Sequence, residues 1–136
     1  TGTPAISEAI GLGEAIDYIT NIGFNNIHNH TKELYDYTIN KLKGLKGLTI
    51  YNINPELPII SFNIDGVHPH DAATIFDEAH ICLRAGHHCA QLLTKWLKVS
   101  GTLRGSFYIY NDYHDCDVFI QKIKDAIEFF SKFNLI

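Results

Sequence analysis

Hydrophobic and polar positions follow two periods along the chain, and the changes of period divide the sequence into eight predicted elements. Apolar residues three and four positions apart are typical of a helix with one buried face, whereas strict alternation is typical of a half-buried strand. The spacing predicts helices over residues 7–19, from the end of the Asn-rich residues 21–29 to about 42, over 70–79 and over about 114–131. Alternation predicts strands over residues 48–51, 58–64, 81–84 and 102–110.

The order of these elements predicts the fold class. Helices and strands occur in pairs rather than in strict alternation, which favours an α+β layer with helices on one face of a small, mainly antiparallel sheet. We expect Gly23 to end the first helix, and Asp112 with Asp115 to cap the last one. No repeat or low-complexity linker divides the 136 residues, so one compact core is expected.

Charge and cysteine content exclude several classes of protein. A formal net charge of −4 gives no overall attraction for nucleic acid or an anionic membrane. No apolar stretch approaches the roughly 18 residues that span a bilayer, and the first residues lack a signal-peptide pattern. We therefore expect a soluble, cytoplasmic protein. The three cysteines are irregularly spaced, which predicts reduced thiols rather than disulfides.

The most informative segment for chemistry is residues 84–91, RAGHHCAQ, which contains Cys89. Loops at strand ends often carry function, and a thiolate is so nucleophilic that modest activation is sufficient. The residue types leave two interpretations of Cys89 open: a nucleophile, or a small packing residue. Cys82, in a predicted strand, and Cys116, beside acidic residues, are expected to be inert.

The only two arginines of the chain, Arg84 and Arg104, both lie near a glycine in predicted strands. A guanidinium group binds a carboxylate through two parallel hydrogen bonds, which lysine cannot reproduce. Their position near a candidate thiol suggests an acidic or amino-acid substrate. The alternative is that each arginine forms a structural salt bridge at the edge of the sheet.

The eight histidines show none of the spacings of a zinc site, so no metal site is predicted. We expect His28 and His30 to be solvated in an Asn-rich turn. Four aromatic residues are expected in the core or on the sheet rather than on a ligand platform: Trp96, Tyr108, Tyr110 and Tyr113.

The RAGHHCAQ segment resembles the active-cysteine segment of the SufS-type (group II) cysteine desulfurases, which are pyridoxal-phosphate enzymes of the class V aminotransferase fold. Residues 1–19, TGTPAISEAIGLGEAIDYI, resemble the Gly-Thr-Pro segment and following helix of that family. Residues 101–111, GTLRGSFYIYN, resemble its Arg-Ala-Ser strand. The chain departs from the family pattern at Leu92, where proline is usual, and at Gly105, where alanine is usual.

This resemblance implies a small C-terminal domain of a fold-type I pyridoxal-phosphate enzyme over residues 1–136. Residues 1–46 would include the helical connection to a larger cofactor-binding domain. Cys89 would take sulfur from cofactor-bound L-cysteine as a persulfide and leave L-alanine. Arg104 would bind the substrate carboxylate and Arg84 would support the same pocket, while Thr3 would reach the cofactor phosphate of the opposite subunit in a homodimer.

No segment resembles the Ser-x-His-Lys context of the family's cofactor lysine, so the 136-residue chain alone is expected to be inactive and to bind no pyridoxal phosphate. An acceptor protein of the Suf system would receive the sulfur for iron–sulfur cluster assembly. Other readings stay open: a selenocysteine lyase or cysteine sulfinate desulfinase of the same fold, a non-catalytic interaction module, or a metal-binding redox protein. Apolar residues of the first helix and around Cys89 should be partly exposed, because they would face the larger domain.

Overall fold

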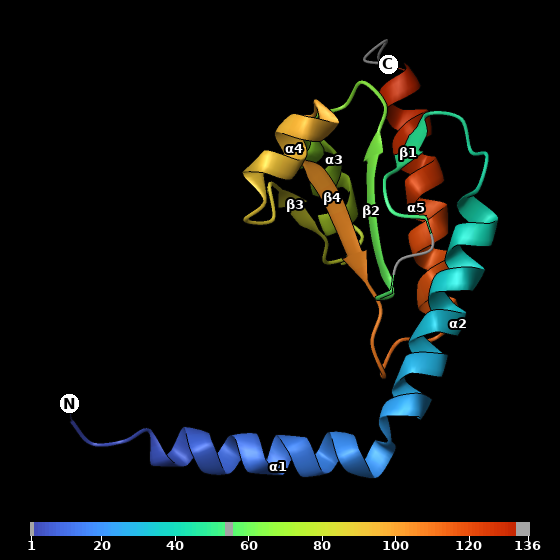
Figure 1. The fold of residues 1–136 in the computed structure, drawn as a ribbon. Coiled ribbons are helices and arrows are strands. Elements are labelled where there is room, and N and C mark those ends of the chain that lie inside the picture. Colours follow the sequence, from blue (N-terminus) through green and yellow to red (C-terminus); the bar gives the residue numbers. More distant parts are fainter. Residues whose placement is uncertain (1, 54–55, 133–136) are drawn as a thin grey trace.

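The computed structural model describes residues 2–53 and 56–132, which form five helices and a four-stranded antiparallel sheet (Figure 1). Residue 1, residues 54–55 and residues 133–136 lie outside the described part, so the expected domain 1–136 extends beyond it at both ends. The elements in chain order are α1 (Ile6–Ile22), α2 (Phe24–Leu42), β1 (Leu48–Ile50), β2 (Ile59–Ile64), α3 (Pro69–Asp77), β3 (Arg84–Gly86), α4 (Gln91–Leu97), β4 (Thr102–Ser106) and α5 (Tyr113–Lys132). The α+β class is confirmed.

The sheet has the strand order β1-β2-β4-β3, and each neighbouring pair is antiparallel. Strand β2 buries every second residue, Ile60, Phe62 and Ile64, against the helices. Because side chains alternate across a strand, Ser61 and Asn63 lie on the opposite face. One face of the sheet therefore holds the apolar core and the other is polar.

An aromatic cluster joins the sheet to the helices. Phe62 of β2 lies with its ring centroid 5.7 Å from that of Phe119 on α5 and 6.1 Å from that of Phe76 on α3. Phe62 and Phe76 are fully buried and Phe119 is nearly so. Edge-to-face contacts of this kind add to the stabilisation from buried area, so these three rings hold the helical layer on the sheet.

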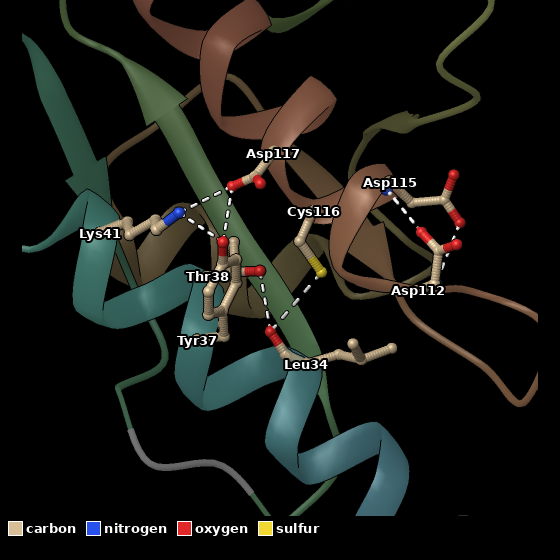
Figure 2. Close-up of polar contacts among 8 residues, drawn as sticks. All are labelled: Leu34, Tyr37, Thr38, Lys41, Asp112, Asp115, Cys116 and Asp117. Carbon is tan, nitrogen blue, oxygen red and sulfur yellow. Dashed lines mark hydrogen bonds and ion pairs between the residues drawn. The ribbon is translucent and has the colours of Figure 1, made fainter.

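Polar contacts fix α5 against α2 (Figure 2). The carboxylate of Asp117 accepts hydrogen bonds from the Tyr37 hydroxyl and the Lys41 ammonium group, each at 2.8 Å. At the start of α5 the Asp115 N–H donates to the Asp112 side chain at 3.0 Å, and the Asp112 N–H donates to Asp115 at 3.2 Å. The predicted cap of this helix is confirmed.

Helix α1 extends away from the rest of the chain and buries none of its residues (Figure 1). Gly23, at φ 90°, ends it by donating its N–H to the Ile19 carbonyl at 2.9 Å, as predicted. Large apolar side chains along α1 are exposed: Ile6, Ile10, Leu12, Ile16 and Tyr18. The expected exposure of this helix is confirmed. Within the described residues no helix is long and apolar enough to cross a membrane.

The first prediction that the structure corrects concerns the Asn-rich segment. Helix α2 begins at Phe24 rather than after Asn29, because the Asn26 side chain donates to the Ile22 carbonyl at 2.8 Å and joins the two helices. His28 and His30 are therefore helical. His28 is exposed, whereas a half-buried His30 contacts the Asn111 carbonyl oxygen at 3.0 Å.

The predicted strand 81–84 is shifted to Arg84–Gly86, because the Ile81 N–H bonds to the Phe76 carbonyl and continues the turn after α3. Strand β4 ends at Ser106 rather than at residue 110, since a turn follows in which the Tyr108 N–H donates to the Asn111 side chain.

Helix α4 was not predicted. The four aromatic residues assigned to the core or sheet are exposed instead, at 77% for Trp96 and 39%, 80% and 49% for Tyr108, Tyr110 and Tyr113.

Candidate active site

The two arginines lie directly opposite each other in the sheet. Arg84 of β3 is the register partner of Arg104 on β4, so both side chains project from the same face. It is the polar face, because the alternate position Gly105 faces Phe119, whose ring would lie 3.3 Å from an added Cβ. The ion pairs recorded between described residues all use lysine. Neither guanidinium group has a carboxylate partner within the part of the chain that the structure describes, which favours an anion site over structural salt bridges.

Cys89 lies in the short loop between β3 and α4, and its side chain is exposed. It shares a surface hollow with Arg84, His87 and His88. His88 and Cys89 have φ values of 53° and 59°, the left-handed region that side chains other than glycine rarely adopt. Such strain persists where the surrounding structure holds it, and it concentrates at functional sites. The thiol is thus accessible and held on a strained turn beside an arginine.

A close contact between two glycines closes the base of the β3–β4 connection, which contains the Cys89 loop and α4. Gly86 ends β3 at φ 122°, and Gly101 immediately precedes β4. A Cβ added to Gly101 would lie 3.1 Å from both the Cα and the carbonyl oxygen of Gly86. Only glycine at position 101 lets the two backbone segments approach this closely. The connection from β3 to β4, which contains Cys89 and α4, therefore leaves and re-enters the sheet at one point.

The two histidines before Cys89 form hydrogen bonds to different elements, His87 to α4 and His88 to β4. Thr94 of α4 donates its hydroxyl to the Gln91 carbonyl at 3.0 Å and therefore accepts from Nδ1 of His87, 3.2 Å away. His88 contacts the Thr102 carbonyl through Nε2 at 3.0 Å. Burial lowers the pKa of His88, and the positive charges of Arg104 and Arg84 lower it further. His88 is therefore neutral near pH 7.

The other two cysteines occupy different surroundings. Cys116 is fully buried, and its thiol donates to the Leu34 carbonyl at 3.8 Å (Figure 2). Burial raises the pKa of this thiol, which keeps it protonated and unreactive, in agreement with the prediction. Cys82 is exposed in the connection before β3 rather than inside a strand. Because Cys82 is exposed like Cys89 but lies outside the Cys89 loop, it can serve as a control thiol when Cys89 is replaced.

The structure places Cys89 and Arg84 at one hollow and pairs Arg84 with Arg104 in the sheet, but Thr3 does not join them. Thr3 is exposed and precedes α1, whose N-terminal end lies far from the sheet (Figure 1). Sequence reasoning missed Thr94 and Thr102, the partners of the two histidines, because both contacts join separate elements. The described residues contain no cluster of three or more histidine, cysteine or acidic side chains able to hold a metal ion.

Comparison with known proteins identifies the relatives of this chain. Residues 1–119 match the class-V aminotransferase family. A probable cysteine desulfurase from Staphylococcus epidermidis is 51% identical over 132 residues, which are 96% of this chain and 32% of that protein. A probable cysteine desulfurase from Halalkalibacterium halodurans is 46% identical over 129 residues, covering 95% of this chain and 32% of the relative.

Solved structures agree with these relatives. The apo cysteine desulfurase from Thermococcus onnurineus NA1 superposes with a TM-score of 0.88 at 36% identity, covering 94% of this chain and 32% of that one. The cysteine desulfurase CsdA from Escherichia coli gives a TM-score of 0.87 at 32% identity and covers 95% and 32%. The chain thus spans about a third of the length of the relatives that it matches.

Proposed function

Because this chain belongs to the class-V aminotransferase family, we propose that it is the C-terminal small domain of a SufS-type (group II) cysteine desulfurase. The observation that carries the proposal is the exposed Cys89 in a hollow beside Arg84, which is paired in register with Arg104. The named relatives support this activity. The whole protein would take sulfur from L-cysteine and transfer it to an acceptor of the Suf system for iron–sulfur cluster assembly.

Arg104 binds the carboxylate of L-cysteine in this proposal. It is half-buried at the centre of the sheet, where a charged hydrogen bond is screened less than at the surface. Arg84 is more exposed and lies on the edge strand β3, so it adds a second positive charge beside the same carboxylate. Two positive groups on one face orient the substrate with its sulfur toward the loop.

Cys89 accepts the sulfur. Its thiolate attacks the substrate sulfur, and an S–S bond forms as the bond between the substrate Cβ and sulfur breaks. The electron pair of that bond stays on Cβ, which takes up a proton to give L-alanine, and Cys89 is left as a persulfide. The short loop presents this persulfide at the surface, where an acceptor thiol can reach it.

The described residues fit a peripheral role toward pyridoxal phosphate. Thr3 offers one exposed hydroxyl, and the two arginines suit an anionic substrate rather than a complete cofactor pocket. When bound, the cofactor supplies delocalisation of the negative charge that develops on the substrate. The lysine and most contacts to the cofactor would come from the rest of the protein, so this chain alone would hold no cofactor.

The arrangement of the whole protein is part of the proposal. Helix α1 buries none of its apolar side chains within the described residues, which suits a surface that the larger domain covers. Residues 1–46 would then contain the helical connection between the domains. We assign the whole protein as a cytoplasmic homodimer in which Thr3 approaches the cofactor phosphate of the opposite subunit.

The test uses the full-length protein with added pyridoxal phosphate. We expect release of sulfide and alanine from L-cysteine under reducing conditions. Cys89→Ser should reduce sulfide release to background while the absorbance of bound cofactor persists. Cys82→Ser, which removes another exposed thiol, should remain active. Near-normal sulfide release by Cys89→Ser would refute the assignment of the nucleophile, and turnover of selenocysteine alone would favour the selenocysteine lyase alternative.

A further inference from the structure

We assign the proton of the neutral His88 ring to Nε2 from its contacts. A carbonyl oxygen only accepts hydrogen bonds, so the 3.0 Å contact with the Thr102 carbonyl requires an N–H at Nε2. The Thr102 hydroxyl oxygen lies 2.9 Å from the same nitrogen. Nδ1 then carries the lone pair, and it is buried with no hydrogen-bond partner among the described residues. This arrangement fixes one tautomer of a neutral imidazole.

The same bond ties the loop to β4 at its most strained point. His88 and Cys89 are consecutive left-handed residues, and neither is a glycine that would adopt this conformation freely. The neighbouring contacts act at the ends of the loop: Ala90 donates its N–H to the His87 carbonyl at 2.8 Å, and His87 contacts Thr94. The His88–Thr102 bond alone links the centre of the loop to the sheet, as far as the described residues show.

The hydrogen bond to Thr102 raises the pKa of His88, but burial and the neighbouring positive charges outweigh it, so the pKa is lowered overall. Burial disfavours the imidazolium ion, and the charged or ionisable groups that act on it are Arg104 of β4, Arg84 of β3 and the adjacent His87. The ring therefore holds its bond to Thr102 as a neutral donor. A substrate carboxylate bound by the arginines would leave that donor bond in place.

We infer that His88 is a positioning residue: its Nε2–H bond to the Thr102 carbonyl holds the left-handed turn that presents Cys89 beside the arginine pair. The inference rests on the proposed function only in taking Cys89 as the nucleophile. It concerns the geometry of the loop and gives His88 no part in proton transfer to the substrate.

Two substitutions in the full-length protein separate positioning from chemistry. Glutamine places an N–H near the position of Nε2 but has no imidazole, whereas leucine keeps the bulk and removes the bond. His80→Leu is the matched control, because His80 is also left-handed, at φ 58°, and exposed outside the loop. Amide hydrogen exchange over residues 86–92, measured by mass spectrometry, reports the loop without requiring enzyme activity.

For His88→Leu we expect exchange over residues 86–92 to accelerate about tenfold, the usual effect of losing one hydrogen bond. The kcat for L-cysteine should fall about tenfold or more with KM within about twofold, because the arginines are untouched. His88→Gln should restore most of the protection and kcat, and His80→Leu should behave as wild type.

Two results would overturn the inference: wild-type exchange and kcat in His88→Leu, or a His88→Gln that protects the loop and yet loses kcat as leucine does. The second result would assign His88 to the chemistry. A wild-type protein without desulfurase activity would refute the proposed function instead, and the exchange data would still decide the role of His88 in the loop.

Discussion

Arg104 and Arg84 face each other across two strands, but they differ in surroundings. Arg104 lies between β2 and β3 and is half-buried, whereas Arg84 is exposed on the edge strand. A charged hydrogen bond is worth about 1.5–3 kcal/mol, and lysine cannot form the planar pair of bonds. In the full-length protein we expect Arg104→Lys to raise KM for L-cysteine about tenfold to a hundredfold. Arg84→Lys should raise it less, and an unchanged KM in Arg104→Lys would favour a structural role.

His88 also makes stability depend on pH. Its pKa in the folded chain lies below the ordinary value of 6.5, because burial and then the arginines disfavour the charged ring. The unfolded chain therefore binds more protons as the pH falls through 6.5 towards the folded pKa, so acidification lowers the free energy of unfolding. Between about pH 7.5 and 5.5 the urea midpoint should fall less in His88→Gln than in wild type. Equal falls of the urea midpoint in wild type and His88→Gln would contradict this prediction.

At the scale of elements, long helices with caps were predictable from the sequence and short ones were not. The start of α5 was predictable from Asp112 and Asp115, because their spacing allows each backbone N–H to donate to the side chain of the other, as the structure shows. Helix α4 has seven residues, and its N-cap residue Ala90 makes no side-chain cap bond. Its large side chains Leu92 and Trp96 are exposed, so no buried stripe marks it as helical.

The candidate site was predictable in its residue types but not in its geometry. Cys89 and the arginines stand out because thiol and guanidinium groups have chemistry that few other side chains share. The alignment of Arg84 with Arg104 depends on the pairing of β3 with β4, which local alternation does not encode. The predicted strand 81–84 placed Arg84 at the end of its strand, whereas it begins β3.

The contact between Gly86 and Gly101 leads to a prediction for these two elements. A Cβ at position 101 would meet backbone atoms at 3.1 Å, and backbone cannot move aside as a flexible side chain does. We expect Gly101→Ala to lower the free energy of unfolding by about 1–3 kcal/mol. Gly11→Ala is the control, because Gly11 lies in α1 with no atom within 4 Å of an added Cβ. Urea unfolding of both variants measures the difference. A Gly101→Ala variant as stable as wild type would show that the backbone at Gly86 and Gly101 can move apart without loss of stability.

At the scale of the whole molecule, the chain divides into a packed part and an uncovered helix. The sheet, α2, α3 and α5 share one apolar core, whereas α1 contributes no buried residue. Solved cysteine desulfurases superpose on 94% or more of this chain although it spans only 32% of their length. We therefore expect the packed part to fold from its own contacts, and α1 to need a further surface that covers its apolar side chains.

The 136-residue chain should therefore fold, self-associate and lack desulfurase activity. Ile10 and Ile16 of α1 are 64% and 53% exposed, and apolar area left in water favours association of copies. Sedimentation should show concentration-dependent oligomers, and replacing both residues by serine should shift the distribution towards monomer while the circular dichroism of the packed part persists. A strictly monomeric wild-type chain would contradict the first expectation. Sulfide release from L-cysteine by this chain with added pyridoxal phosphate would contradict the second, because Cys89 and the arginines would then suffice without the lysine assigned to the rest of the protein.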